Sequence, residues 1–393
     1  MTENEIVRRV LRRAQRVASA SAPHAPAVLE WARANSAALF GLKAAQAKAL
    51  TWTALARLLR REPDDACAEP AGVLRLAADF ARLMRLDPID SAIVEVLFAA
   101  DRLRLVSEVL DLLTPHRVSL AALIGEAAGV PAADAERRVR LNPLVRTGQV
   151  TFQLDRYQPE FLEVRWTLRR LIDRMPQDAA EIAALMVGPR QDARLPLAAF
   201  AHVEDADFLR RLLEGARRER ACGVNVLIHG PPGSGKTEFA RALAAASGAV
   251  LHSAGEAHDD GEEPDRTDRI GALLMGQRLL QGAGAVILFD EMEDLVGDAR
   301  PSLGDWMSGR QGSKVFVNRL LETNPVPVLW TTNAIGNVDP AIVRRMSHVL
   351  KMDLPSQATA LRMLEHVAGE EGVVPGTSLA ELVTAAPETA SVS

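Results

Sequence analysis

The spacing of apolar residues divides the chain into two parts of different texture. From Glu5 to about Leu113, apolar side chains recur every three or four residues, as in Ile6, Val10 and Leu11. This period gathers apolar side chains on one face of a helix and predicts about five or six packed helices. After about residue 200, short apolar runs alternate with helical segments instead. That alternation is typical of an α/β domain built on a parallel sheet.

Residues 89–175 show a pattern of their own. Helices are expected near 91–102, 119–128 and 132–140, and Arg146-Thr147-Gly148 then lies between two short β-like runs. Three helices followed by a hairpin predict a winged-helix-like module, with a connecting helix after it.

A DNA-reading module of this kind would carry Arg137, Arg138 and Arg140 on its recognition helix. Asp134 and Glu136 precede these arginines and dilute their positive charge. The arginines therefore have two interpretations, a nucleic-acid contact or a solvated helix surface.

The strongest chemical signal follows the apolar run at 224–228. The next residues complete the pattern G-x-x-x-x-G-K-[ST] between an expected strand and an amphipathic helix, which is the context of a phosphate-binding loop. The loop residues are Gly230, Pro231, Pro232, Gly233, Ser234, Gly235, Lys236 and Thr237. Glycines let backbone N–H groups point at phosphate oxygens, Lys236 supplies a cation, and Thr237 offers a hydroxyl to Mg²⁺. The alternative is a glycine-rich turn without a ligand.

A second apolar run, at 285–289, ends in the carboxylates Asp290 and Glu291. Two carboxylates at the end of a buried strand are costly unless a cation uses them, so Asp290 is expected to hold Mg²⁺. Glu291 is then the candidate base for an attacking water. The alternative is an ordinary acidic strand end.

A third run, at 326–332, ends at Asn333. Its side chain would lie between the first two strand ends, near the terminal phosphate and the attacking water. Asn333 is therefore a candidate catalytic residue, and its alternative role is to cap a turn.

Together these motifs resemble the AAA+ ATPases, and within them the AAA group. GPPGSGKT, VILFDE, VFVNRLLE, VLWTTNAIGNVDPAIVRR and VLKMDLPS follow one another in that family's order, from about Ala199 to Leu354. The resemblance implies a P-loop NTPase core, ATP and Mg²⁺ as ligands, and a ring, usually a hexamer, with ATP at the subunit boundaries. It also implies that Arg344 and Arg345 stand where arginine fingers reach the neighbour's nucleotide. The alternative is that one of the two caps a helix.

The chain departs from this family between its motifs. Residues 252–271, where ring unfoldases carry an aromatic pore loop, contain no Phe, Tyr or Trp but seven carboxylates from Glu256 to Asp268. This segment has two interpretations, an acidic pore that receives a basic protein segment or a solvated loop. An insertion at 297–314 contains Trp306 and Met307, a candidate substrate contact or a packing element.

The expected organisation has five segments, and the last is short. They are a helical N-terminal region at 1–88, the winged-helix-like module and connecting helix at 89–175, a linker at 176–197, the ATPase core at 198–354 and a partial helical lid at 355–393. By resemblance to the family, the lid should carry an arginine that contacts the phosphates. No such arginine is present here, since the last arginine, Arg362, lies in the first expected lid helix. We therefore expect either a fragment or an incomplete lid with impaired hydrolysis.

Charge and cysteine usage narrow the class of protein. Residues 1–200 carry 28 basic and 24 acidic side chains, while the remainder carries 18 and 27, and the net charge of −5 argues against a dedicated nucleic-acid binder.

The N-terminus lacks the apolar segment of a secretory signal, and no apolar run is long enough to span a membrane. Cys67 and Cys222 form no CxxC pair, which fits a cytoplasmic protein without disulfides.

The leading hypothesis is a cytoplasmic, Mg²⁺-dependent AAA+ ATPase that forms a ring and remodels a protein client, with the N-terminal region recognising it. One alternative is a nucleic-acid-linked ATPase that uses the winged-helix-like module. Another is a nucleotide-dependent assembly switch with weak turnover. No membrane partner is expected.

Overall fold

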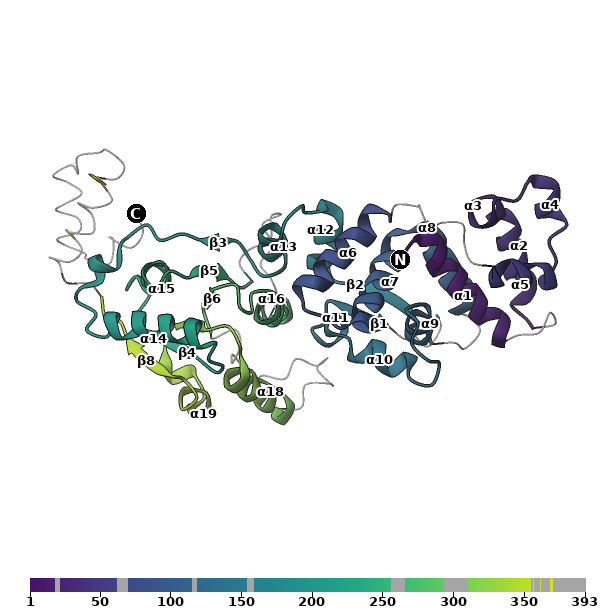
Figure 1. Cartoon of the computed structure of the whole chain (residues 1–393). Coiled ribbons are helices and arrows are strands. Elements are labelled where there is room, and N and C mark those ends of the chain that lie inside the picture. Colours follow the sequence, from purple (N-terminus) through teal and green to yellow (C-terminus); the bar gives the residue numbers. More distant parts are fainter. Residues whose placement is uncertain are drawn as a thin grey trace. The chain divides into compact units, whose positions relative to one another are not determined.

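Helices build the first part of the chain, as its apolar period predicts (Figure 1). The computed structural model describes residues 1–17, 22–61, 70–114, 119–153, 159–255, 266–292, 310–354, 356, 361 and 368–369. The chain divides into two units, Met1–Ile182 and Ala183–Ser393. None of the helices in the described ranges is both long and apolar enough to span a membrane.

The described residues of the first unit form helices and one hairpin. Its helices are α1 (Glu3–Val17), α2 (Ala25–Ala34), α3 (Ser36–Phe40), α4 (Ala44–Lys48), α5 (Trp52–Arg60), α6 (Gly72–Leu83), α7 (Pro88–Arg102), α8 (Arg104–Leu113), α9 (Leu120–Ala127), α10 (Ala135–Leu141), α11 (Pro143–Arg146) and α12 (Trp166–Arg174). More helices occur before residue 113 than the apolar period predicts, because α3 and α4 are about one turn long and too short to show a period.

Arginines of α1 hold the end of α5. The Arg8 Nη2 donates to the carbonyls of Leu58 at 2.9 Å and Arg61 at 2.5 Å, and the Arg12 Nε donates to Leu59 at 2.6 Å. The last carbonyls of a helix have no partner within it, so these guanidinium groups supply donors at the end of α5, where the Leu58 carbonyl also accepts from the Arg61 amide at 3.2 Å. Part of the basic charge of this unit therefore serves its own packing.

The hairpin of the first unit does not lie where the sequence predicts it. Pro143 begins the short helix α11, and the Asn142 side chain caps it by accepting from the Leu144 amide at 3.1 Å. The paired strands are β1 (Val150–Gln153) and β2 (Phe161–Val164), with Val150 opposite Val164. The prediction of a hairpin turn at 146–148 was therefore wrong, because a capped helical turn occupies the segment before β1.

The second unit contains a six-stranded sheet in the order β3-β5-β6-β7-β4-β8. Its strands are β3 (Arg190–Gln191), β4 (Asn225–His229), β5 (Val250–Ser253), β6 (Ala285–Phe289), β7 (Val328–Thr332) and β8 (His348–Lys351). All neighbouring pairs are parallel except β3 with β5. The helical elements along this part of the chain are α13 (Ala179–Met186), η2 (Leu197–Phe200), α14 (Ala206–Glu219), α15 (Lys236–Ala246), α16 (Arg266–Leu279), α18 (Arg310–Thr323), η3 (Ile335–Asn337) and α19 (Pro340–Val343).

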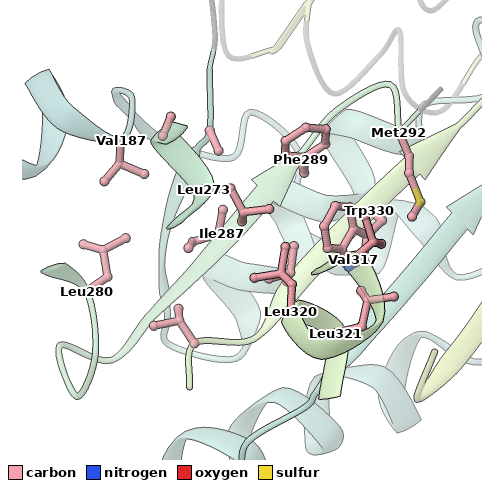
Figure 2. Close-up of a cluster of buried hydrophobic side chains, with 14 of the residues drawn as sticks. Val187, Leu273, Leu280, Ile287, Phe289, Met292, Val317, Leu320, Leu321 and Trp330 are labelled. Atoms are coloured by element: carbon pink, nitrogen blue, oxygen red, sulfur yellow. The ribbon is translucent and has the colours of Figure 1, made fainter. Parts of the chain in front are cut away.

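Both faces of this sheet are buried, and successive residues of one strand serve different faces. Ile287 and Phe289 of β6 belong to a cluster with residues of α16 and α18, including Leu273 and Leu320 (Figure 2). Val286 and Leu288 belong instead to a cluster with residues of α14 and α15. Strands buried on both faces are apolar throughout, which is why these runs stand out in the sequence. The predicted α/β fold with a parallel sheet between helices is confirmed.

Part of the segment expected as a linker, 176–197, contributes to this core. Val187 is buried in the cluster around β6, and Leu195 is buried in the cluster around α14 and α15. Within the same segment, β3 pairs with β5 so that Arg190 lies opposite His252. The strand is only two residues long and therefore leaves no period in the sequence.

Three features of the sequence fall outside the described residues. They are most of the acidic segment near 256–265, the insertion with Trp306 and Met307, and nearly all of the expected lid after residue 355.

Candidate nucleotide-binding site

Three neighbouring strand ends assemble the predicted site. In the order β6-β7-β4 the strands run parallel, so their carboxyl ends meet at one edge of the sheet. There β4 leads into the glycine-rich loop and α15, β6 leads into Asp290 and Glu291, and β7 leads into Asn333. Motifs that lie about a hundred residues apart in the chain therefore share one edge.

Close packing explains the first glycine of the loop. A Cβ atom on Gly230 would lie 1.9 Å from the carbonyl oxygen of Met352, whose amide donates to the His229 carbonyl at 2.7 Å. Gly233 and Gly235 have φ angles of 81° and 82°, a conformation that side chains disfavour. These glycines bring the chain sharply from β4 into α15, which begins at Lys236.

The loop contains a buried hydroxyl that fits a phosphate ligand. The Oγ atom of Ser234 is buried, and no hydrogen-bond partner is found for it in the part of the chain that the structure describes. Buried polar groups normally have a partner, and a phosphate oxygen accepts from such a hydroxyl.

Lys236 connects two of the predicted motifs. Its Nζ atom donates to the carbonyls of Gly230 at 2.9 Å and Pro231 at 3.0 Å and to Asn333 Oδ1 at 2.9 Å. The side chain is 8% exposed. The lysine of the loop and the asparagine at the end of β7 therefore belong to one site.

Thr237 and Asp290 form the second connection. The Thr237 Oγ1 donates to Asp290 Oδ2 at 2.9 Å, and the hydroxyl of Thr331 donates to the other carboxylate oxygen, Oδ1. Hydroxyl and carboxylate oxygens are the ligands that Mg²⁺ prefers. The chemistry of this pair therefore fits the predicted magnesium ion.

Glu291 follows Asp290 in an unusual backbone conformation. Its φ angle is 54°, its side chain is exposed, and its amide donates to Thr331 Oγ1 at 3.0 Å. Thr331 is the first threonine of the TTN sequence that ends at Asn333. Thr331 could not be expected in the site from the sequence, because one of two adjacent threonines in an apolar strand carries no pattern of its own.

A histidine beside the loop adds no positive charge at neutral pH. Burial lowers the pKa of His229 below its ordinary value, and the neighbouring charges of Lys351 and Lys236 act in the same direction. The imidazole therefore stays neutral beside Gly230, and Lys236 remains the cation of the loop.

Comparison with known proteins identifies the family to which this nucleotide-binding region is similar. Residues 226–354 match the model of the ATPase family associated with various cellular activities (AAA). The chain carries an AAA ATPase domain. The match covers all of the strand ends described above, and it confirms the prediction of an AAA-type ATPase.

Individual relatives resemble part of the chain. A probable inactive ATP-dependent zinc metalloprotease, FTSHI 4 of Arabidopsis thaliana chloroplasts, is 30% identical over 37% of this chain and 18% of its own length. A putative 26S proteasome regulatory subunit homologue of Methanocaldococcus jannaschii is 31% identical over 40% of this chain and 43% of its own length. The chain thus spans less than half the length of these relatives. A solved AAA domain of FIGL-1 in complex with ADP is 19% identical, with a TM-score of 0.35, over 49% of this chain and 68% of that one.

The two arginines after α19 of the AAA domain differ in their surroundings. Arg345 donates from Nε to Glu322 Oε1 at 2.7 Å and from Nη1 to the Ala341 carbonyl at 2.7 Å. Arg344 is exposed, and its side chain makes no hydrogen bond or ion pair within the described ranges. Arg345 therefore has a role within its own domain, whereas Arg344 is available to another molecule.

Outside the AAA domain, the arginines considered for DNA contact are largely engaged. Arg138 pairs with Asp87 and, at 2.9 Å, with Asp90. Arg140 pairs with Glu136 and Glu160, both at 2.9 Å. These carboxylates reduce the charge that phosphates would meet, so the geometry does not favour the nucleic-acid alternative.

Proposed function

We propose that the AAA domain binds ATP with Mg²⁺ and hydrolyses it. The observation that supports this most directly is the pair of 2.9 Å hydrogen bonds, Lys236 to Asn333 and Thr237 to Asp290. They bring together the four side chains that phosphate binding, metal binding and water positioning require, from three separate strand ends.

Each residue then has a defined task. The loop amides and Lys236 bind the β- and γ-phosphates, and Thr237 and Asp290 hold Mg²⁺, which when bound neutralises charge on the phosphate oxygens. Asn333 orients a water toward the γ-phosphorus, and Glu291 accepts a proton from it. The water oxygen forms a bond to phosphorus while the bond to the ADP oxygen breaks, so the products are ADP and phosphate.

Arg344 is the arginine that we propose to act across a subunit boundary. An arginine supplied by a neighbour stabilises charge that develops on the γ-phosphate, and it must be accessible to reach that neighbour. The exposure of Arg344 and the engagement of Arg345 with Glu322 support this choice. The proposal includes a ring, a hexamer by resemblance to the family.

The biological task that we propose is the remodelling of a protein client in the cytoplasm. Residues 1–182 form a unit of their own, and its buried apolar side chains include Leu97 and Leu123. A separate unit of this kind suits recognition of a client.

Steady-state ATPase measurements test the enzymatic part. Lys236→Ala is expected to abolish nucleotide binding, whereas Glu291→Gln is expected to keep binding and lose turnover by about a hundredfold or more. Equal rates for wild type and both variants would contradict the proposal. Tight ATP binding by the wild type with negligible turnover would favour the assembly switch instead.

The client is testable with the same variant. Glu291→Gln in ATP is expected to retain a client that the same protein in ADP releases. Retention that is identical in ATP, in ADP and with Lys236→Ala would argue against remodelling.

A further inference from the structure

One peptide group in the site is held at both of its polar atoms. The carbonyl of Asp290 accepts a hydrogen bond from Arg269 Nη2, and the amide of Glu291 donates to Thr331 Oγ1 at 3.0 Å. These two atoms belong to the peptide bond that joins Asp290 to Glu291. Arg269 comes from α16 and Thr331 from β7, so two different elements fix the plane of this peptide group.

Thr331 is suited to this position because its hydroxyl both accepts and donates. The Oγ1 atom accepts from the Glu291 amide and donates to the Asp290 carboxylate. The residue is 1% exposed, and its carbonyl accepts from the Met292 amide at 2.8 Å. Valine would match its shape and lose both hydroxyl hydrogen bonds, whereas serine would keep them.

Packing against Phe289 and Gly255 positions the Arg269 side chain beside the peptide group. Its guanidinium group lies over the ring of Phe289, with Cζ 4.6 Å from the ring centroid. A Cβ atom on Gly255 would lie 2.7 Å from Arg269 Cγ, so the glycine at this position leaves room for the arginine stem. The packing of Arg269 around β6 therefore supports its hydrogen bond to the Asp290 carbonyl.

The peptide group held in this way precedes a strained residue. Glu291 has a φ angle of 54°, in the left-handed region that residues other than glycine disfavour. Such a conformation persists only when the surroundings determine it, and it occurs often at functional sites. Rotation of the peptide plane would relieve the strain and would also redirect the Glu291 side chain.

We propose that Arg269 and Thr331 are positioning residues for Glu291. They hold the Asp290–Glu291 peptide group in one orientation and thereby aim the Glu291 carboxylate at the attacking water. This inference rests on the proposed hydrolysis of ATP. Neither residue touches the nucleotide in this role, so their loss affects turnover more than binding.

The test compares Arg269→Met and Thr331→Val with matched controls. Thr331→Ser keeps the hydroxyl, and Arg218→Met removes an arginine that is 77% exposed on α14 and pairs only with Glu219 among the described residues. Arg269→Met and Thr331→Val are expected to lower kcat about tenfold, and both controls are expected to remain within about threefold of wild type. The dissociation constant for ADP is expected to change less than about threefold in Arg269→Met.

A second readout does not depend on turnover. Amide hydrogen exchange at Glu291 is expected to accelerate in Arg269→Met and Thr331→Val but not in Thr331→Ser. Thr331→Val removes the acceptor of this amide, and Arg269→Met removes the donor to the carbonyl of the same peptide group. In a Glu291→Gln background, Arg269→Met is expected to cause no further loss of the residual rate, since it acts through Glu291.

The outcomes separate this proposal from the proposed function. A wild-type rate no higher than that of Lys236→Ala would overturn ATP hydrolysis, and exchange at Glu291 would still report whether the peptide group is held. Unchanged exchange in folded Arg269→Met and Thr331→Val would overturn the positioning role. A wild-type kcat in Arg269→Met, or a full further loss in the Glu291→Gln background, would overturn it as well.

Discussion

A single close contact restricts the residue type at the first glycine of the nucleotide loop. The Met352 carbonyl lies so close to Gly230 that only a hydrogen atom fits between them. The Ser347 hydroxyl accepts from the Asn225 amide at 3.1 Å at the other end of the contact between β4 and β8. The path of the chain after β8 therefore restricts which residue can occupy position 230.

This restriction predicts different effects for two glycine substitutions. Gly230→Ala forces a Cβ atom to 1.9 Å from the Met352 oxygen, and we expect it to cost about 1–3 kcal/mol of unfolding free energy and to weaken ATP binding. Gly215→Ala, within α14 and with no heavy atom within 4 Å of the added Cβ, is expected to stabilise by about 0.5–1 kcal/mol. Urea unfolding and nucleotide titration measure both. Similar changes in the two variants would show that the carbonyl contact is not decisive.

The start of α7 shows how one carboxylate can join two helices. Asp87 caps α7 by accepting from the amides of Ile89 and Asp90, both at 2.9 Å, and it also pairs with Arg138 of α10. The hydrogen bond from the Asp90 amide, together with Arg138, holds the pKa of Asp87 below its ordinary value of 3.8. A carboxyl with a lowered pKa stabilises the fold above its ordinary pKa, and the contribution is lost as the pH falls through the lowered value.

We therefore expect the effect of removing this carboxylate to depend on pH. Asp87→Ala is expected to cost about 1 kcal/mol at pH 7 through loss of the cap, and less at acid pH, as the pH falls through the lowered pKa and the wild-type carboxyl is protonated too. Asp87→Asn keeps a capping oxygen and is the control for the charge. Urea unfolding at both pH values measures the difference, and a cost that does not shrink in acid would rule out this role of the charge.

At the scale of the whole molecule, the site is incomplete if Arg344 serves a neighbour. Every other proposed catalytic residue lies at the carboxyl end of the sheet in its own subunit, whereas Arg344 is exposed after α19. Its function would therefore appear only in an assembly.

Mixing two inactive variants tests this directly. Lys236→Ala retains Arg344 but cannot bind ATP, and Arg344→Ala retains the loop but lacks the arginine. We expect each alone to be inactive and their mixture to recover part of the ATPase rate, because a subunit of one supplies what the other lacks. Mixtures of Lys236→Ala with Glu291→Gln are expected to recover none. Activity of Arg344→Ala alone at the wild-type level would exclude the role in trans.

Arg345→Ala gives the contrasting result at the same surface. It removes the contacts with Glu322 and the Ala341 carbonyl, so we expect a loss of stability of about 1 kcal/mol. Denaturant unfolding measures this loss. A larger effect on turnover than that of Arg344→Ala, without a change in stability, would reverse the assignment of the two arginines.

The fold of the AAA domain and the candidate residues of its site could be predicted from the sequence. Loop residues such as Gly230 and Lys236 are adjacent in the chain, and strands buried on both faces form unbroken apolar runs, so local patterns reveal both. The ends of parallel strands meet by topology, which is why Asp290 and Asn333 could be expected near Lys236.

Only the tertiary structure decided features that depend on contacts between distant segments. Nothing in the chain near Arg344 and Arg345 distinguishes them, since the difference arises from Glu322 in another helix. The hairpin between β1 and β2, and the two-residue strand β3, were misplaced or missed because their pairing is non-local and leaves little period. Arg269 and Thr331 belong to the site only because folding brings α16 and β7 to one peptide group, and a hydrogen bond across the fold leaves no trace in residue spacing.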